Sequence, residues 1–200
     1  MGLGYRWIHT MQGIIDIDDV VVEIGASREG CSTEYLATFC KQFRLEFHSV
    51  DFSSEAIEKI EKIDGVIVHR RMGEDWLQTI NWVDKRIGFA YLDNFDWIYS
   101  ISANSVVRAR VKDYVQQGLV LNNFNSALSH FNQAVEIVRL ASDKCMVVID
   151  DTWMREDTIF LGKGMLAAPY LMSKGFQLVN KPKVGDEVSD SFVVLARELK

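Results

Sequence analysis

The sequence predicts an α/β fold: a doubly wound, mostly parallel sheet of seven strands, closed by an antiparallel C-terminal hairpin. Short apolar runs alternate with stretches whose apolar residues repeat at helical spacing, and this alternation is typical of successive strand–helix units. The first run leads into a turn bracketed by Gly25 and Gly30. The last two strand-length runs are joined by a polar loop rather than a helix, which favours the hairpin.

Length and charge limit the range of functions. The chain has 200 residues, of which 48% are hydrophobic, enough for one sizeable core and short for two. We therefore expect a single domain over residues 1–200. The net charge is −6, with Lys and Arg scattered among 28 acids, so the sequence offers no basic stripe for a nucleic-acid backbone. We expect a small molecule, not a nucleic acid, as the partner.

Cysteine usage and hydropathy indicate the compartment. Cys31, Cys40 and Cys145 are odd in number and widely spaced, which predicts reduced thiols and a cytoplasmic location. The sequence has no run of the roughly 18 apolar residues that a membrane span needs, so we expect no membrane partner. The oligomeric state stays open, and a homo-oligomer is compatible with the sequence.

The N-terminal part leads into the first strand. Apolar residues recur at near-helical spacing over residues 5–15, so residues 1–18 are expected to hold a short amphipathic helix. The apolar run 20–22 predicts a buried strand that ends in Glu23. The glycine turn follows, and then a helix that Ser32 can cap.

The second predicted strand, residues 45–50, ends at Asp51. A carboxylate at this strand end can accept hydrogen bonds from both hydroxyls of a ribose. The alternative is an aspartate that caps the helix after Ser53.

The third predicted strand, residues 65–69, is followed by Gly73, Glu74 and Asp75. Acidic side chains in this position are also favoured by the dipole of a helix N-terminus. A ligand contact and a helix start are both compatible with this pattern.

The fourth and fifth predicted strands, residues 87–92 and 145–149, are followed by Asp93 and by Asp150 with Asp151. The carboxyl ends of parallel strands meet at one edge of a sheet, where ligands bind. Like charges gathered at that edge need a cation or hydrogen-bond donors.

The connection between these two strands is long. Residues 125–141 are predicted as its helix, because their apolar residues form one stripe. Residues 97–121 are mixed in character, and we interpret them as an irregular insertion that acts as a lid over the strand ends. Residues 176–180 and 191–195 are the strands of the closing hairpin.

Spacing separates three nucleotide-binding motifs at the first turn. Gly25 and Gly30 have the spacing of a phosphate loop, but Cys31 stands where the lysine should be, and the dinucleotide fingerprint lacks its middle glycine. What remains, Glu23-x-Gly25 followed by Gly30-x-Ser32, resembles the first motif of class I S-adenosylmethionine-dependent methyltransferases. A purely structural strand–turn–helix corner is the alternative.

The resemblance extends from Val20 to the last strand and implies a Rossmann-like fold with a site for S-adenosyl-L-methionine. The implied cofactor-binding residues are Glu23, Gly25, Ser27, Gly30, Ser32, Asp51, Gly73, Glu74, Asp75 and Asp93. The turn from Gly25 to Gly30 would surround the methionine part of the cofactor, and Glu23 would anchor either this turn or the amino group. Asp51 would hold the ribose, and the turn that contains Gly73, Glu74 and Asp75 would meet the adenine.

The acids at the fourth and fifth strands resemble a metal site. Asp93, Asp150 and Asp151 match the triad of the catechol-type and macrolide-sugar Mg-dependent O-methyltransferases. Three oxygen ligands suit Mg²⁺ better than zinc, and the metal would lower the pKa of the attacking substrate oxygen. An acid pair that merely caps a chain segment is the alternative.

The catalytic base is assigned by location. The resembled enzymes carry a lysine shortly after the fourth-strand aspartate, but residues 94–97 hold none. Besides Asp93, the candidate catalytic residues are Lys163 and His130. Alternatively, Lys163 contacts an anionic substrate group and His130 is structural.

Together these patterns predict a methyltransferase that transfers a methyl group in line to a small-molecule hydroxyl, with Mg²⁺ assistance as an option. Two alternatives stay open: a metal-independent methyltransferase, and a catalytically idle binding subunit of the same fold. The identity of the acceptor is not determined by the sequence.

Overall fold

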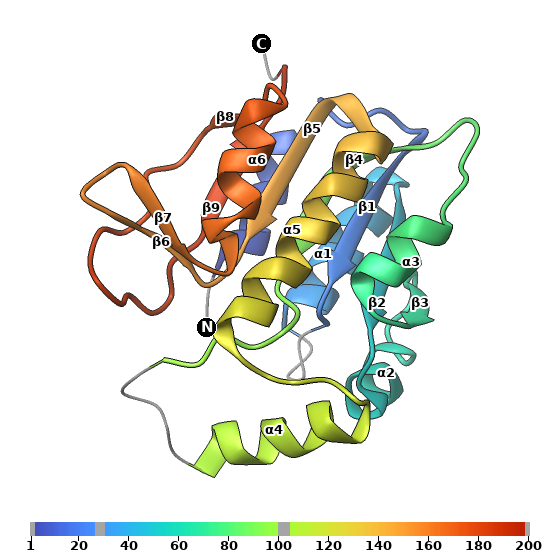
Figure 1. Cartoon of the computed structure of the whole chain (residues 1–200). Coiled ribbons are helices and arrows are strands. Elements are labelled where there is room, and N and C mark those ends of the chain that lie inside the picture. The colour runs from blue at the N-terminus through green and yellow to red at the C-terminus, as the bar shows by residue number, and fades with distance from the viewer. Residues whose placement is uncertain (1–2, 27–30, 100–104, 199–200) are drawn as a thin grey trace.

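The fold is built on one twisted sheet. The computed structural model describes residues 3–26, 31–99 and 105–198, and within these ranges seven strands form this sheet in the order β3-β2-β1-β4-β5-β9-β8 (Figure 1). The strands are β1 (Asp19–Ile24), β2 (Glu46–Asp51), β3 (Ile67–Arg70), β4 (Arg86–Leu92), β5 (Ala141–Ile149), β8 (Gln177–Leu178) and β9 (Val193–Ala196). The five strands β1 to β5 run parallel to one another, and β9 is antiparallel to both of its neighbours, β5 and β8.

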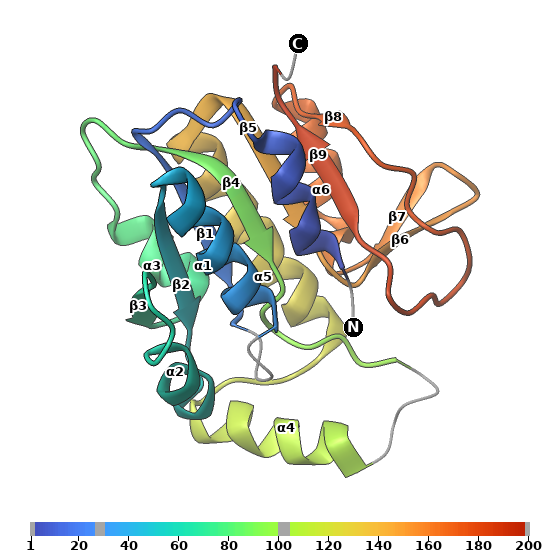
Figure 2. The same ribbon diagram turned by 180° about the vertical axis from the view of Figure 1, so that it is seen from behind.

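Helices cover both faces of the sheet. On one face lie η1 (Gly4–Met11) and α1 (Cys31–Phe43), as Figure 2 shows. On the other face lie α3 (Gly73–Thr79), α5 (Asn123–Leu140) and α6 (Ala167–Ser173). The other helices of the described ranges are α2 (Ser54–Ile60), which follows β2, α4 (Ser105–Gln116), and the short 3-10 helix η3 (Lys163–Met165).

The central strand, β1, shows why the run from Val20 to Val22 is apolar without interruption. Val20, Val22 and Ile24 pack on the α3–α5–α6 side, whereas Val21 packs on the η1–α1 side. Successive side chains of a strand point to opposite faces, and both faces are covered here. A doubly covered strand therefore appears as a continuous apolar run rather than an alternating one.

Helix α5 crosses the middle of the sheet and begins at a side-chain cap. The Asn122 side chain accepts a hydrogen bond from the Asn125 backbone N–H at 2.7 Å, which satisfies one of the free donors of the first turn. Ala134 and Ile137 are buried against the sheet. This placement brings the first half of α5 close to the carboxyl ends of the strands.

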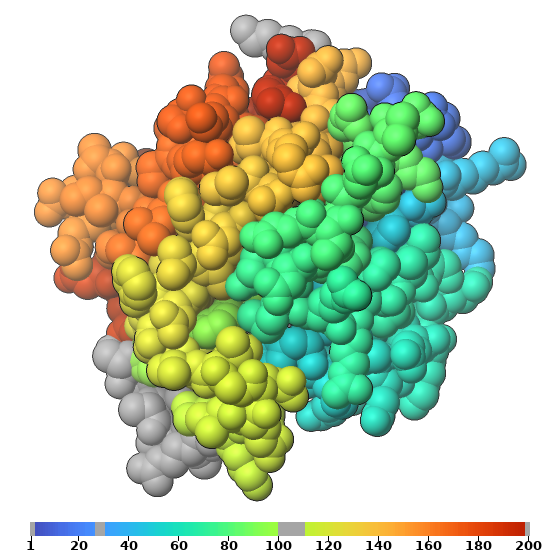
Figure 3. All heavy atoms as spheres, turned by 45° about the vertical axis from the view of Figure 1, so that its right-hand side comes forward, coloured from blue at the N-terminus to red at the C-terminus, as the bar shows by residue number. Residues whose placement is uncertain are grey.

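Helix α4 stands beyond the carboxyl ends of the strands (Figure 3, yellow-green). Its Tyr114 is 1% exposed and packs on Phe52 after β2 and on Phe95 after β4, with ring centroids 5.1 and 4.7 Å apart. The Asp96 backbone N–H donates a hydrogen bond to the Tyr114 hydroxyl oxygen at 2.9 Å. Tyr114 thus fixes α4 to the loops that end two strands.

The predicted fold class is confirmed, including the seven-stranded, mostly parallel sheet and its antiparallel C-terminal hairpin. Three details differ. The N-terminal helix is a 3-10 helix, residues 97–121 contain the regular helix α4, and β6 (Thr152–Arg155) pairs with β7 (Ile159–Gly162) in a small unpredicted hairpin. The lid role of residues 97–121 and the division into one domain stay predictions. No helix in the described ranges combines the length and hydropathy of a membrane span.

Candidate functional site

The candidate site lies where the sheet order reverses. From β1 the chain moves outward through β2 and β3 on one side, and β4 and β5 lie on the other side. In open parallel sheets, ligands bind outside the carboxyl ends of the strands at such a switch point. Acids end or follow β2, β4 and β5 at this edge, and α4 lies beyond it (Figure 1).

Gly25 forms a tight corner at the end of β1. Its φ is +92°, and an added Cβ would fall on the backbone of Asp93 and Asn94. The Gly25 N–H donates to the Val50 carbonyl at 2.8 Å, and the Asp93 N–H donates to the Ile24 carbonyl at 2.8 Å. Only glycine fits this position, and the sheet itself fixes the corner on both sides.

Glu23 holds the corner in place through hydrogen bonds to α1 and β2. Its carboxylate is fully buried and accepts hydrogen bonds from the hydroxyls of Ser32 (2.6 Å), Thr33 (2.7 Å) and Ser49 (2.7 Å). Burial raises the pKa of Glu23 to about 7, although these three donors lower it in part. The acid therefore joins α1 and β2 to β1. The predicted cap residue Ser32 is instead the second residue of α1, and its hydroxyl serves this carboxylate.

Asp51 ties the same corner to β2. Its Oδ2 accepts the Ala26 backbone N–H at 3.0 Å, and its Oδ1 accepts the Ser53 backbone N–H at 2.7 Å. The cap of α2 is Ser53, whose side chain accepts from the Ala56 N–H, so the capping alternative for Asp51 is not supported. Ser27 and Gly30, also predicted to bind the cofactor, lie outside the described residues.

The turn after β3 is connected to α5. Gly73 is buried, and an added Cβ would fall on the side chain of Ile24. The Glu74 carboxylate accepts hydrogen bonds from the Ser129 hydroxyl (3.0 and 3.1 Å) and from Gln133 Nε2 (3.1 Å). Asp75, by contrast, is exposed. Of this predicted trio, Gly73 packs against the end of β1 and Glu74 faces α5.

Asp93, Asp150 and Asp151 are brought together by the structure around the ammonium group of Lys163. Lys163 Nζ lies 2.6 Å from Asp93 Oδ1 and 3.1 Å from Asp151 Oδ2; its side chain is 2% exposed, against 30% and 26% for the two acids. The Tyr91 hydroxyl lies 3.0 Å from Asp150 Oδ2 and 3.3 Å from Asp93 Oδ2. We call these four residues, Asp93, Asp150, Asp151 and Lys163, the acid–lysine cluster.

Charge is distributed unevenly in the acid–lysine cluster. Burial, together with the charges of Asp93 and Asp151, raises the pKa of Asp150 well above its usual range. Burial also acts on Asp151, but the Lys163 ammonium and a 2.8 Å hydrogen bond from the Tyr99 hydroxyl lower its pKa overall. Burial would lower the pKa of Lys163, yet the carboxylates raise it well above its usual range. Lys163 keeps its proton, so its interpretation as a general base is not supported.

The ligand set predicted for Mg²⁺ does not fit a divalent ion. The three carboxylates do meet, but the Lys163 ammonium already bridges Asp93 and Asp151. Magnesium requires oxygen ligands at roughly 2.0–2.1 Å in octahedral geometry, and here it would lie against a buried positive charge. Among the described residues, no group of three or more His, Cys, Asp or Glu side chains could hold a metal ion. The predicted magnesium site is therefore not supported.

His130 lies inside the fold rather than on the cleft. It is 0% exposed, and its Nδ1 lies 2.7 Å from the Ser126 carbonyl oxygen one turn earlier in α5. Burial and the Lys163 charge lower its pKa to about 3. A neutral, enclosed imidazole is a weak base, and the geometry favours the structural alternative for His130.

Two tyrosines of the site were not predicted. Tyr91 of β4 lies two residues before Asp93, which directly follows the strand, so the alternation of side chains places both on the same side, and this spacing was a usable signal. Tyr99 donates to Asp151 from the segment interpreted as a lid, and its ring stacks on Trp153 with centroids 5.9 Å apart. No local pattern indicates this second contact, because it depends on how the segment folds back.

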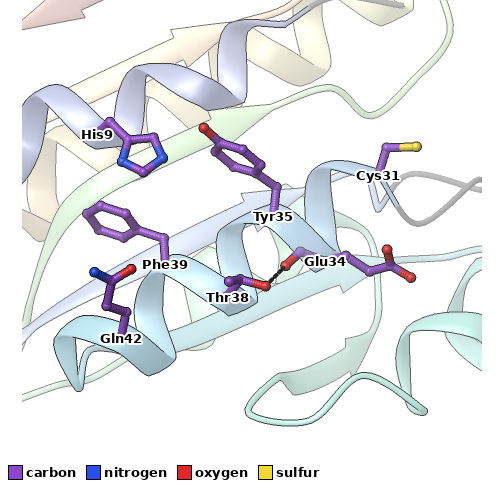
Figure 4. Close-up of a pocket in the computed structure, with 7 residues that line it drawn as sticks. All are labelled: His9, Cys31, Glu34, Tyr35, Thr38, Phe39 and Gln42. Atoms are coloured by element: carbon purple, nitrogen blue, oxygen red, sulfur yellow. Dashed lines mark hydrogen bonds between the residues drawn. The ribbon is translucent and has the colours of Figure 1, made fainter.

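A hollow of about 310 Å³ lies between η1 and α1, on the face of the sheet that these two helices cover (Figure 4). The His9 ring packs edge-on against Tyr35 and Phe39, with centroids 5.4 and 5.2 Å away. In the described part of the chain, the lining of this hollow includes none of the predicted site residues. The acid–lysine cluster is therefore distinct from it.

Comparisons with known proteins agree with the fold. A protein provisionally named an rRNA methylase from Clostridium thermocellum has a TM-score of 0.57 at 8% identity, with 98% of this chain and 97% of that chain covered. A methyltransferase provisionally assigned in Streptococcus mutans and solved with SAH gives 0.52 at 12% identity, with 98% of each chain covered. An O-methyltransferase provisionally assigned in Klebsiella pneumoniae gives 0.52 at 10% identity, with 97% and 79% covered. No protein-family model and no curated protein matches the sequence. The chain thus has the Rossmann-like fold of these methyltransferases.

Proposed function

We propose that this chain is an S-adenosylmethionine-dependent methyltransferase that transfers a methyl group to the hydroxyl of a small molecule without a divalent metal. One observation carries the proposal. The Gly25 corner lies at the switch point of the sheet, in a conformation that only glycine adopts without strain, and Asp51 and the β4 backbone hold it there. Structurally similar proteins are named as methyltransferases, and one of them was solved with SAH.

The cofactor would lie along the carboxyl ends of β1, β2 and β3. The Gly25 corner would contact the methionine part, and Asp51, which is only partly buried, would accept hydrogen bonds from the ribose hydroxyls. Glu74 and Gly73 would border the adenine. Glu23 is completely buried and already accepts three hydroxyl hydrogen bonds, so its part in this scheme is to hold the corner.

The acceptor would lie beside the acid–lysine cluster. Methyl transfer breaks the bond from sulfur to the methyl carbon and forms a bond from that carbon to the acceptor oxygen, whose proton must leave. Asp93 is partly exposed, and burial raises its pKa although Lys163 offsets part of that rise. A carboxylate with a raised pKa is a better proton acceptor near neutral pH. Alignment of sulfur, carbon and oxygen would supply much of the acceleration.

Titration calorimetry with S-adenosylmethionine tests the cofactor site. We expect saturable binding to wild type and a loss of at least tenfold in affinity for Asp51→Ala. The matched control is Asp64→Ala, because Asp64 is an exposed acid that forms a surface ion pair with Lys41 and should leave binding unchanged. Absence of heat with the wild-type protein would end the proposal.

Methyl transfer from labelled cofactor to a panel of hydroxylated and amino compounds tests the reaction. We expect turnover of hydroxyl acceptors that persists in the presence of chelator. Cofactor binding without turnover of any acceptor would instead favour the idle binding subunit. Transfer to amines alone would show that the acceptor atom is nitrogen and not oxygen.

A further inference from the structure

We propose that Lys163 is a positioning residue that supplies the fixed positive charge of the acceptor site in place of a divalent cation, so that the acceptor is held by Asp93 and Asp151 through a single hydrogen-bond donor. This inference rests on the proposed function for the reaction, but its charge arrangement can be tested without turnover.

The Lys163 ammonium has no N–H group left to donate to a ligand. Its Nζ contacts Asp93 Oδ1 at 2.6 Å, Asp151 Oδ2 at 3.1 Å and the Asp93 carbonyl oxygen at 3.4 Å. These three acceptors match the three N–H groups of an ammonium. With a side chain that is 2% exposed, Lys163 acts through the two acids and not on the acceptor.

The flanking glycines hold the lysine in this buried place. Gly162 has a φ of +78°, and an added Cβ there would fall on the Asp151 carbonyl oxygen. An added Cβ at Gly164 would lie 2.7 Å from the Thr152 side chain, whose hydroxyl oxygen accepts the Gly164 N–H at 2.9 Å. Glycines on both sides therefore let η3 approach the start of β6 closely enough for the lysine to reach the cluster.

The two acids can each accept a further hydrogen bond. Asp93 Oδ2 lies 3.3 Å from the Tyr91 hydroxyl, and Asp151 Oδ1 accepts the Tyr99 hydroxyl at 2.8 Å, but a carboxylate oxygen can accept two hydrogen bonds. Asp93 and Asp151 keep 30% and 26% of their side chains exposed while Lys163 binds them from the protein side. Partly exposed carboxylates accept hydrogen bonds from a hydroxyl or an amine. A metal would instead chelate two neighbouring substrate oxygens. We therefore infer that a single hydroxyl suffices and that a vicinal pair gives no advantage.

Thermal unfolding with added Mg²⁺ tests the charge arrangement. Wild type should melt at the same temperature with millimolar MgCl₂ and with chelator. Lys163→Met leaves two carboxylates uncompensated, and its melting temperature should fall on the order of 10 °C. Mg²⁺ should restore part of that loss, because the ion can then lie between the Asp93 and Asp151 carboxylates; a variant that regains no stability with Mg²⁺ would show that the lysine does not stand in for a divalent cation.

A matched ion pair serves as the control. Lys41 and Asp64 also lie 2.6 Å apart but are 68% and 84% exposed, so Lys41→Met should melt like wild type. If Lys163→Met does not fold, the double variant Lys163→Met/Asp93→Asn should recover folding, because it removes one uncompensated charge. A wild-type melting temperature that rises with Mg²⁺ would overturn the proposal, and so would a Lys163→Met variant as stable as wild type.

The acceptor requirement is tested with paired compounds, a monophenol and its catechol. We expect similar kcat/KM values for the two, unchanged by chelator. A chelator-sensitive preference of tenfold or more for the catechol would overturn the inference. If S-adenosylmethionine does not bind at all, the proposed function fails while the melting results still decide the role of Lys163.

Discussion

Replacing Glu23 by Gln should change how the stability of the protein depends on pH. Burial raises the pKa of this carboxyl from 4.5 to about 7 in the folded chain, so the folded state binds the proton more tightly than the unfolded state. The stabilising contribution is complete below pH 4.5 and is lost as the pH rises through about 7. Glu23→Gln does not ionise and should lack this loss.

The size of the effect follows from the same values. Each tenfold change in proton affinity corresponds to about 1.4 kcal/mol, so the shift amounts to about 3 kcal/mol. Between pH 4.5 and about 7, the free energy of unfolding of wild type should fall about 3 kcal/mol further than that of Glu23→Gln.

Urea unfolding followed by tryptophan fluorescence at a series of pH values measures this difference. The comparison uses the slope against pH, because Gln also changes the hydrogen bonds to the three hydroxyls. Glu34→Gln, an exposed acid on α1, the helix that donates two hydroxyl groups to Glu23, should keep the wild-type slope. Parallel curves for wild type and Glu23→Gln would refute the reasoning that a desolvated carboxyl lies beneath the glycine corner.

Three further changes are informative. Gly25→Ala should lower the melting temperature and abolish cofactor binding, because a Cβ at φ +92° collides with the backbone after β4; calorimetry with wild-type affinity would contradict this. Tyr114→Phe removes the acceptor of the Asp96 N–H and should cost about 1–2 kcal/mol in urea unfolding, and an unchanged midpoint would show that this contact does not hold α4. His69 has its pKa lowered to about 4 by burial and by the charge of His48, so wild type should lose stability as the pH falls from 6.5 toward 4. His69→Gln should reduce that loss. If the free energy of unfolding fell equally in both proteins below pH 6.5, the prediction would be wrong.

The strands could be predicted because burial on both faces leaves a clear mark in the sequence. The hairpin β6–β7 left no such mark. Its turn uses Glu156 and Asp157 at positive φ values of 54° and 58°, where glycine or asparagine would have been the expected signal. Helix α4 was missed for a related reason, because in the part of the helix whose side chains are described, residues 111–116, the buried side chain is that of Tyr114 and its neighbours are exposed.

The candidate site was predictable in its acids but not in its charge balance. Parallel strands place Asp93 and Asp150 at one edge, so their proximity follows from topology alone. The partner of Asp93 is Lys163, which is 70 residues away in the sequence, and only the packing of η3 brings it in. The glycines on either side of the lysine were the available signal. Their meaning becomes clear once the backbone contacts of Asp151 and Thr152 are known.

The position of β9 has a consequence for the order of folding. This strand fills the place between β5 and β8, yet it comes after both of them in the chain, and Val193, Val194 and Leu195 are completely buried. Until β9 has been synthesised and has paired with β5, one apolar edge of β5 stays unpaired. Such edges tend to pair with strands of other molecules. A ribosome-bound or truncated chain that ends before residue 193 should therefore depend on chaperones, whereas supplying the missing segment as a separate peptide could complete the sheet in trans.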